Sequence, residues 1–423
     1  MTSDSNAARD VIVIGGGPAG AATATLLARG GRDVLLLERE RFPRFHIGES
    51  LMPATYWSLE RLGMLDRMGR SVFPRKHSVQ FFLPNGKATA PFYFADVDPH
   101  ESSVTWQVDR GEFDRMLLDN AAQAGVEVRH GVAVREVLFD DGRAVGVRAA
   151  DGGGREREIP AKVIVDASGQ SALLSRTLKL RTFDPMLKNA AVFTRYRGAR
   201  RDPGRDAGAI LVLHTSQKNS WFWFIPLPDG LTSIGVVGRL DYLISSRAAD
   251  PVQVFEEELA LCPALGERLR EAERVEWMRV LKDFTYVSRR VAGDGWILAG
   301  DAFGFLDPVY SSGVLLALKS AEFAADAIIA SFASGDFSAA SLGRFGPRYV
   351  DGMEALRRVV HAFYARDFSF ARFLRRYPGL RDEVIHALTG NVFRRPVDDL
   401  IAALKQELPN PDYRPLALPG EDA

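Results

Sequence analysis

Residues 11–38 read VIVIGGGPAGAATATLLARGGRDVLLLE, and this stretch predicts the unit around which the fold is built. An apolar strand over 11–14 leads into a glycine-rich turn, and a helix of small residues follows over 21–29. A second apolar strand over 34–38 completes a strand–turn–helix–strand unit that ends in an acidic residue. This order is typical of a dinucleotide-binding α/β fold.

Each glycine of the turn has a separate task in such a unit. Gly15 permits the tight turn, and Gly17 lets backbone amides approach a pyrophosphate at the helix N-terminus. Gly20 allows the helix to pack closely on the sheet. Glu38 ends the second strand, where a carboxylate can accept the ribose hydroxyls. We therefore expect Gly15, Gly17, Gly20 and Glu38 to bind a dinucleotide.

The composition is that of an ordinary globular enzyme, with 423 residues, 46% of them hydrophobic and 26% charged. The net charge of zero gives no reason to expect nucleic acid or an anionic membrane as partner. Cys262 is the only cysteine, so we expect no internal disulfide and a reducing, cytoplasmic location. We expect neither a signal peptide nor a membrane span, and the seven histidines predict no metal site.

The cofactor-binding pattern recurs in three segments, 1–72, 102–180 and 285–340. Strand-rich sequence fills 73–101 and 181–284, and helical sequence follows over 341–423. We therefore predict an α/β fold in which a β-sheet-rich substrate domain interrupts a Rossmann-like dinucleotide-binding domain, with a helical C-terminal region.

Within these segments the periodicity predicts particular elements. Helices are expected over 53–65, 110–124, 252–272 and 313–333. A β-hairpin is expected within 73–103, around a turn at residues 84–86.

A second cofactor motif lies far from the first. Asp301 follows a short apolar strand and can face a ribityl hydroxyl, as flavoproteins require. Pro308 then leads to Ser311, Ser312 and Gly313, where a helix N-terminus can face an anion such as a halide or a reduced flavin. Because one extended cofactor would satisfy both motifs, we predict FAD. No second glycine fingerprint is present, so electrons come from a separate flavin reductase, free reduced flavin or a transient nicotinamide contact.

Four further residues are candidate cofactor contacts. Arg44 and Ser50 follow the ribose-binding acid directly, and Gln107 and Arg110 open the helix after the predicted hairpin. Arginine at these places suits a phosphate or adenosine oxygen. The alternative is a structured loop and a surface charge on a helix.

With these motifs in place, the chain resembles the flavin-dependent halogenases of phenols, pyrroles and carrier-tethered aromatics, over about residues 9–345. These belong to the wider fold of aromatic hydroxylases and geranylgeranyl reductases. Residues 221–226 match the family's Trp-x-Trp-x-Ile-Pro motif, which places Trp221 and Trp223 near the flavin. Taken alone, these aromatic residues would fit any core strand. Lys76 matches the active-site lysine of the family.

The resemblance implies the reaction. Reduced FAD, O2 and chloride or bromide yield hypohalous acid, with the halide held near Ser312 and Gly313. This species travels through an internal tunnel to Lys76, which either hydrogen-bonds it or forms a haloamine. An electron-rich phenolic or pyrrolic ring, free or tethered to a carrier protein, is then halogenated. Lysine suits the task because it joins three donors to a nucleophilic amine.

Two positions depart from the family pattern. Leu315 stands where histidine is usual, and Phe303-Gly304 replaces an Ala-Cys pair. These departures favour a second hypothesis, an FAD-dependent reductase or hydroxylase of the same fold without halide chemistry. A third is a non-catalytic flavin-binding module. Aromatic residues of the tail, among them Phe363, Tyr364 and Phe368, either line a substrate pocket or fill a helical core.

Overall fold

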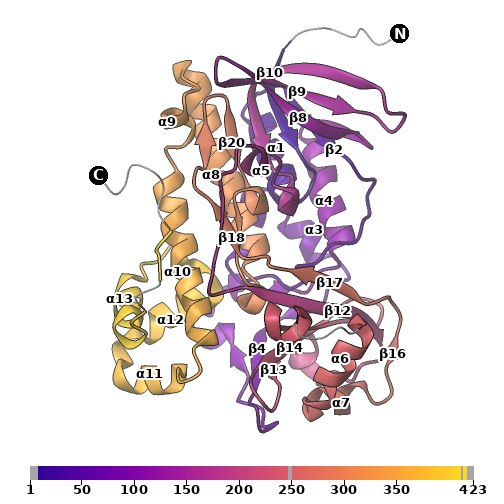
Figure 1. Cartoon of the computed structure of the whole chain (residues 1–423), viewed down its shortest axis with the longest axis vertical. Coiled ribbons are helices and arrows are strands. Elements are labelled where there is room, and N and C mark those ends of the chain that lie inside the picture. Colours follow the sequence, from indigo (N-terminus) through magenta and orange to yellow (C-terminus); the bar gives the residue numbers. More distant parts are fainter. Residues whose placement is uncertain (1–7, 246–249, 411–412, 417–423) are drawn as a thin grey trace.

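The computed structural model describes residues 8–245, 250–410 and 413–416. Two eight-stranded sheets lie at opposite ends of the molecule, and the C-terminal helices lie along one side (Figure 1). Strands of the first sheet come from distant parts of the chain, whereas the second sheet is built mainly from one continuous segment. The predicted fold class is confirmed.

The first sheet is centred on β1 (Arg9–Ile14), which pairs in parallel with β2 (Val34–Glu38) on one side and β10 (Glu156–Asp166) on the other. The apolar residues of β1 and β2 are buried, as expected of parallel strands covered by helices. The remaining strands are β7 (Glu127–His130), β8 (Ala133–Asp140), β9 (Arg143–Ala150), β19 (Ala292–Gly293) and β20 (Trp296–Leu298).

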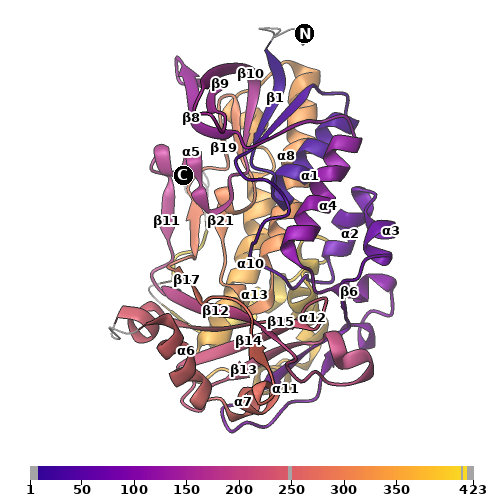
Figure 2. The same ribbon diagram turned by 90° about the vertical axis from the view of Figure 1, so that its right-hand side faces the viewer.

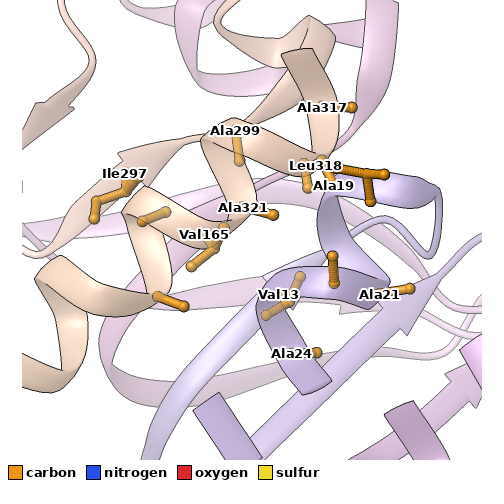
Figure 3. Packing of buried hydrophobic residues seen from close by; sticks show 14 of the residues in the cluster. Val13, Ala19, Ala21, Ala24, Val165, Ile297, Ala299, Ala317, Leu318 and Ala321 are labelled. Atoms are coloured by element: carbon orange, nitrogen blue, oxygen red, sulfur yellow. The ribbon is translucent and has the colours of Figure 1, made fainter. Parts of the chain in front are cut away.

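Three helices pack against this sheet. The glycine-rich turn leads into α1 (Pro18–Arg29), which lies between α8 (Gly313–Ser334) and α4 (Arg110–Gln123). Small side chains let α1 and α8 approach each other and the sheet. Figure 3 shows the small side chains of Ala19, Ala21 and Ala24 on α1 and of Ala317 and Ala321 on α8. Close packing therefore fixes the start of α1 relative to the start of α8.

The second sheet is mostly antiparallel. Its central strands are β12 (Asn189–Arg197), β15 (Leu231–Arg239), β14 (Ser220–Pro226) and β13 (Ile210–His214). Its outer strands are β4 (Ser78–Phe82), β5 (Phe92–Tyr93), β16 (Glu273–Arg274) and β17 (Arg279–Lys282). Two small sheets join the layers, one of β11 (Arg181–Phe183), β18 (Tyr286–Ser288) and β21 (Gly304–Phe305), the other of β3 (Arg75–Lys76) and β6 (Thr105–Trp106).

The tail is helical, as predicted. It contains α9 (Ala339–Leu342), α10 (Gly346–Tyr364), α11 (Phe370–Arg376), α12 (Arg381–Thr389) and α13 (Asp398–Glu407). Helix α10 leads from the side of α8 toward the second sheet (Figure 2). Its last turn therefore brings side chains of the tail to the central strands.

Two predicted helices are wrong in extent. Residues 252–272 form α6 (Pro251–Ala260) and α7 (Pro263–Leu269) rather than one helix, because Pro263 lacks an amide hydrogen and begins a new helix. Residues 53–65 contain α2 (Thr55–Arg61), which ends before Gly63, a glycine with φ +65°. The predicted hairpin is present as the pairing of β4 with β5, and it is shorter than expected.

Among the helices of the three described ranges, none is both long and apolar enough to span a bilayer.

Candidate active site

A cavity of about 900 Å³ extends from the glycine turn of the first sheet to the central strands of the second sheet. It brings together most of the residues predicted from the sequence: Gly15, Gly17, Glu38, Arg44, Ser50, Arg110, Trp221, Trp223, Asp301, Pro308, Ser311 and Gly313. Four predicted residues do not border it: Gly20, Lys76, Gln107 and Ser312. The two motifs at the ends of the chain thus meet at one elongated hollow.

Of the three predicted glycines, Gly17 leaves room for a ligand, whereas Gly15 and Gly20 are closely surrounded by protein atoms. Gly15 has φ +100°, and a Cβ there would lie 2.5 Å from the Ala167 carbonyl oxygen. A Cβ on Gly20 would lie 1.9 Å from the Gly15 oxygen, so Gly20 serves packing. A Cβ on Gly17 would meet only Arg44, at 3.5 Å. Gly17 is the position where backbone can approach a bound group.

Glu38 lies at the carboxyl end of β2 and is buried. Its Oε2 accepts the Gly16 amide at 2.7 Å, and its Oε1 accepts the Glu40 amide at 2.8 Å. The carboxylate is thereby held in a fixed orientation at the cavity wall, the place where a ribose is expected.

Arg44 and Arg110 share one buried acid. Arg110 donates from Nε and Nη2 to both oxygens of Asp114, at 2.8 and 2.9 Å. Arg44 donates from Nη1 to the same carboxylate at 3.2 Å. Both arginines border the cavity, so Asp114 fixes two positive charges beside it. Asp114 escaped the sequence analysis because it is one of several acids on an ordinary helix.

Asp301 faces the cavity from the segment after β20. Burial raises the pKa of its carboxyl to about 7, and the nearby Arg110 charge opposes that rise. The side chain can therefore accept or donate a hydrogen bond near neutral pH. Either role suits a ribityl hydroxyl.

Trp221 and Trp223 lie two residues apart on β14, so both side chains project from the same face of the sheet into the cavity wall. Their ring centroids are 6.4 Å apart. Phe193 on β12, which is separated from β14 by β15, adds a third ring, 5.7 Å from Trp223. This end of the cavity is aromatic and apolar, as an isoalloxazine ring requires.

The loop before α8 forms the adjoining wall. Pro308, Ser311 and Gly313 border the cavity, and Ser311 has a left-handed backbone with φ +61°. The Ser312 side chain turns inward, and its buried hydroxyl oxygen has no hydrogen-bond partner among the described residues. The first amides of α8 lie at this wall, where the helix dipole favours an anion.

Lys76 lies behind the cavity rather than on its wall. It is 3% exposed, and its Nζ donates to Ser50 Oγ and to the Leu51 carbonyl oxygen, each at 2.9 Å. The Phe94 ring lies 5.6 Å from Nζ. Burial lowers the pKa of the amine to about 7. In the described part of the chain, no carboxylate pairs with Lys76, so the amine is easily deprotonated.

Ser50 links the lysine to the cavity. Its hydroxyl oxygen accepts a hydrogen bond from Lys76, and it also borders the cavity in which its predicted cofactor contact would be made. Gln107 is bridged to Ser50 through the backbone, and its side chain donates to the Gly208 carbonyl at 3.0 Å. The structure therefore places Gln107 beneath the site, where it supports the strand segment around Ser50.

The departures from the family pattern lie away from the cavity. Leu315 is fully buried and packs beside Gly390 of the tail, where an added Cβ would lie 2.4 Å from it. Phe303 is equally buried and contacts the Tyr349 ring. Neither residue borders the cavity. Both side chains pack against residues of the C-terminal region instead.

Tail aromatics divide into two groups. Phe363 and Tyr364 pack beside Trp221, whereas Phe368 and Phe373 belong to a separate cluster within the tail. None of these side chains borders the cavity.

One further ion pair at the site was not predicted. Arg195 donates from Nη2 to Glu49 at 2.6 Å and contacts Asp109 at 3.0 Å. Glu49 borders the cavity and is buried, and this burial raises the pKa of its carboxyl despite the opposing Arg195 charge. The sequence signal that could have identified Glu49 as a site residue is its position between Gly48 and Ser50.

The observed cavity fits FAD. Its lining combines the glycine turn, aromatic side chains, the fixed carboxylate of Glu38, two arginines and Asp301. The open side of Gly17 and the unpartnered Ser312 hydroxyl are features that a bound group would explain.

Comparisons with known proteins point the same way. A family model described as tryptophan halogenase matches residues 10–98 and 86–374. The chain is 32% identical to the 1H-pyrrole-2-carbonyl-(peptidyl-carrier protein) chlorinase of Pseudomonas fluorescens, over 91% of this chain and 89% of that protein. It is 33% identical to the corresponding brominase of Pseudoalteromonas luteoviolacea, over 91% and 92%. Six other halogenase relatives are longer, and this chain covers 61% to 69% of each.

Among solved structures, the flavin-dependent brominase Bmp2 superposes with a TM-score of 0.83 at 30% identity. The match covers 95% of this chain and 99% of that one.

Proposed function

This chain belongs to the tryptophan halogenase family of flavin-dependent enzymes, and from that membership we propose that Lys76 directs halogenation of a pyrrole ring carried on a peptidyl carrier protein. The enzyme is an FAD-dependent halogenase that uses O2 and chloride or bromide and acts on an aromatic substrate. The hypothesis of an oxidoreductase without halide chemistry and that of a non-catalytic flavin module are therefore set aside.

The position of Lys76 carries the proposal. A lysine that is buried, has no carboxylate partner in the described residues and is bonded to Ser50 at the cavity wall has no structural need for its charge. An ammonium has three donors, and two of them meet Ser50 and Leu51. The remaining one is free to meet a small oxygen-containing reactant.

When bound, reduced FAD supplies the activated oxygen that oxidises a halide to hypohalous acid. The chain's own residues then have three tasks. Amides around Ser311 and Gly313 hold the halide, and Trp221 with Trp223 shields the reacting end from water. Lys76 receives the hypohalous acid behind Ser50, at a distance from the flavin that protects both reactants.

Transfer of the halogen to the ring then conserves atoms and charge. The halogen leaves the hypohalous oxygen for a ring carbon, the ring gives up one proton, and the proton joins the released hydroxide as water. Because the pKa of Lys76 is about 7, both charge states are present near neutral pH. The ammonium can polarise the oxygen by a hydrogen bond, and the amine can carry the halogen as a haloamine.

A carrier-bound pyrrole is the favoured substrate because of how much of each relative's length this chain matches. The two relatives whose names specify this substrate align over about nine tenths of both chains. The longer halogenase relatives match only part of their own length. We also propose a separate flavin reductase as electron donor and a cytoplasmic location, for which the single cysteine is the support.

We propose the domain division given above as a working description. Its support is that the first sheet draws its strands from 1–72, 102–180 and 285–340, and the second from 73–101 and 181–284.

Substrate choice is tested by mass spectrometry of the product. The purified enzyme with reduced FAD, O2 and bromide or chloride receives either pyrrole-2-carbonyl carrier protein or free pyrrole-2-carboxylate. Halogenation of the carrier-bound ring alone is expected. Equal turnover of the free acid, or turnover of simple phenols in place of either, would exclude the carrier-bound assignment.

A further inference from the structure

The two tryptophans of the cavity wall are held by different parts of the molecule. The indole nitrogen of Trp223 donates to Ser233 Oγ at 3.1 Å, within the second sheet. The indole nitrogen of Trp221 donates to the Tyr364 hydroxyl at 2.9 Å. Tyr364 is the last residue of α10, so the helical tail holds Trp221 in place.

Tyr364 passes this bond on to a buried acid. Its hydroxyl lies 2.9 Å from Asp307 Oδ2, and the same oxygen accepts Asn189 Nδ2 at 2.8 Å. An indole N–H can only donate, so the Tyr364 oxygen accepts from Trp221 and its own hydrogen goes to Asp307. The chain of donors from Trp221 through Tyr364 thus ends on an ionised carboxylate.

Asp307 in turn shapes the loop that leads into α8. Its Oδ1 accepts the Val309 amide at 3.2 Å, which caps the short turn of residues 308–310. Pro308, Ser311 and Gly313 of this loop border the cavity. One carboxylate therefore joins the tail to the loop in which we place the halide.

We propose that Tyr364 is a positioning residue for halogenation, because its hydroxyl couples Trp221 on one wall of the cavity to Asp307 beneath the other. The inference rests on the proposed function for its catalytic consequence, although the coupling itself is a property of the protein alone. Removing the hydroxyl would leave a buried indole N–H without an acceptor and a buried carboxylate with one donor fewer.

The surroundings of Asp307 make the coupling measurable. Burial raises the pKa of its carboxyl to about 6, while the bonds from Asn189, Tyr364 and Val309 oppose that rise. The titratable groups that face it are Tyr364 from α10 and Tyr310 from its own turn; β12 contributes Asn189. Within the described residues it forms no ion pair. Loss of the Tyr364 hydroxyl should therefore raise the pKa of Asp307 further.

The direct test follows the indole N–H signal of Trp221 by NMR in the FAD-bound protein between pH 5 and 8. The signal is assigned by its loss in Trp221→Phe. In the wild-type protein it should shift with a midpoint near pH 6 as Asp307 titrates, and in Tyr364→Phe this shift should disappear. The Trp223 signal should not respond in either protein. A Trp221 signal that is insensitive to pH, or that titrates equally in both proteins, would overturn the coupling.

Halogenation rates then test the consequence. Tyr364→Phe should lower kcat about tenfold and move the acid limb of the pH–rate profile to higher pH, while the affinity for FAD is retained. Tyr349→Phe is the matched control, because Tyr349 lies on the same helix and its hydroxyl donates to the Leu316 carbonyl, at 3.2 Å, outside the chain of bonds from Trp221 to Asp307. It should change neither kcat nor the profile.

Should Tyr364→Phe fail to fold, Asp307→Asn provides the second test, since it should abolish the pH response of Trp221; a persisting response would refute the role of Asp307. If the wild-type enzyme makes no halogenated product, the proposed function fails while the NMR result still decides the coupling. An unchanged pH–rate profile in a folded, active Tyr364→Phe enzyme would reject the positioning role.

Discussion

Lys76 Nζ lies 2.9 Å from Ser50 Oγ, and of these two residues only Ser50 borders the cavity assigned to the cofactor. Among the described residues, Ser50 is therefore the one side chain at the cavity wall that is hydrogen-bonded to the lysine. In the described residues this is the one side-chain hydrogen bond of Ser50, so its own proton is free to point toward the cavity. The hydrogen-bonded pair therefore connects the cavity to the buried amine of Lys76 behind its wall.

Ser50→Ala should impair halogenation more than cofactor binding. The substitution removes an acceptor from the buried ammonium, which lowers the pKa of Lys76 further and leaves the amine held by Leu51 alone. We expect the halogenation rate to fall about tenfold and the dissociation constant for FAD, measured by fluorescence, to change by less than about twofold.

Thr105→Val is the control for this variant, because it removes a buried hydroxyl from the strand paired with Lys76 without touching Nζ. A large loss of FAD affinity in Ser50→Ala, with a normal rate at saturating FAD, would show instead that Ser50 acts on the cofactor.

Lys76→Met should stabilise the protein in a pH-dependent way. The folded-state pKa of about 7 lies below the ordinary value of 10.5, so below pH 7 the folded protein carries a buried charge that the unfolded chain places in water. Replacement by methionine removes that penalty, with a gain of roughly 5 kcal/mol at most near pH 6.

The gain should shrink as pH rises from 7 toward 10.5, where the amine becomes neutral in both states. Thermal unfolding of both proteins between pH 6 and 10 measures it. A difference in Tm that is constant over this range would mean that the burial of Lys76 does not disfavour its charge.

Two glycines of the first turn should respond oppositely to the same substitution. Gly17→Ala should fold normally and lose FAD affinity, since its new methyl group points toward the cavity and meets only Arg44. Gly20→Ala should lower the unfolding temperature by several degrees, since its methyl group would collide with the Gly15 carbonyl oxygen. Thermal unfolding and FAD titration of both variants separate the two effects. Equal loss of stability in both would contradict the assignment of Gly17 to binding.

Much of the fold could be predicted because local signals and tertiary structure agree. The glycine turn, Glu38 and the small-residue helices α1 and α8 each have a periodicity that one parallel sheet satisfies. The break at Pro263 was missed because apolar residues continue on both sides of it. Helix boundaries of this kind depend on one missing amide rather than on periodicity.

Residues of the site could be predicted only where they belong to a recognisable sequence motif. Gly17, Asp301 and Trp221 stand in recognisable patterns, and the structure brings all three to one cavity. Asp114 and Tyr364 have no such pattern, because only the fold brings Arg44 to Asp114 and Asp307 to Tyr364, across 70 and 57 residues of sequence. The hydrogen bond between Ser50 and Lys76 likewise depends on the fold, which brings together two residues 26 positions apart.

The most direct test of the central claim compares the wild-type protein with the variant Lys76→Ala. The control is Lys87→Ala, because Lys87 is an exposed lysine of the same segment. Each is given reduced FAD, O2, bromide or chloride and the pyrrole-2-carbonyl carrier protein, and halogenated product is measured by mass spectrometry. We predict product from the wild-type and Lys87→Ala proteins and none from Lys76→Ala, with FAD bound equally by all three. Halogenation by Lys76→Ala at the wild-type rate would contradict the account.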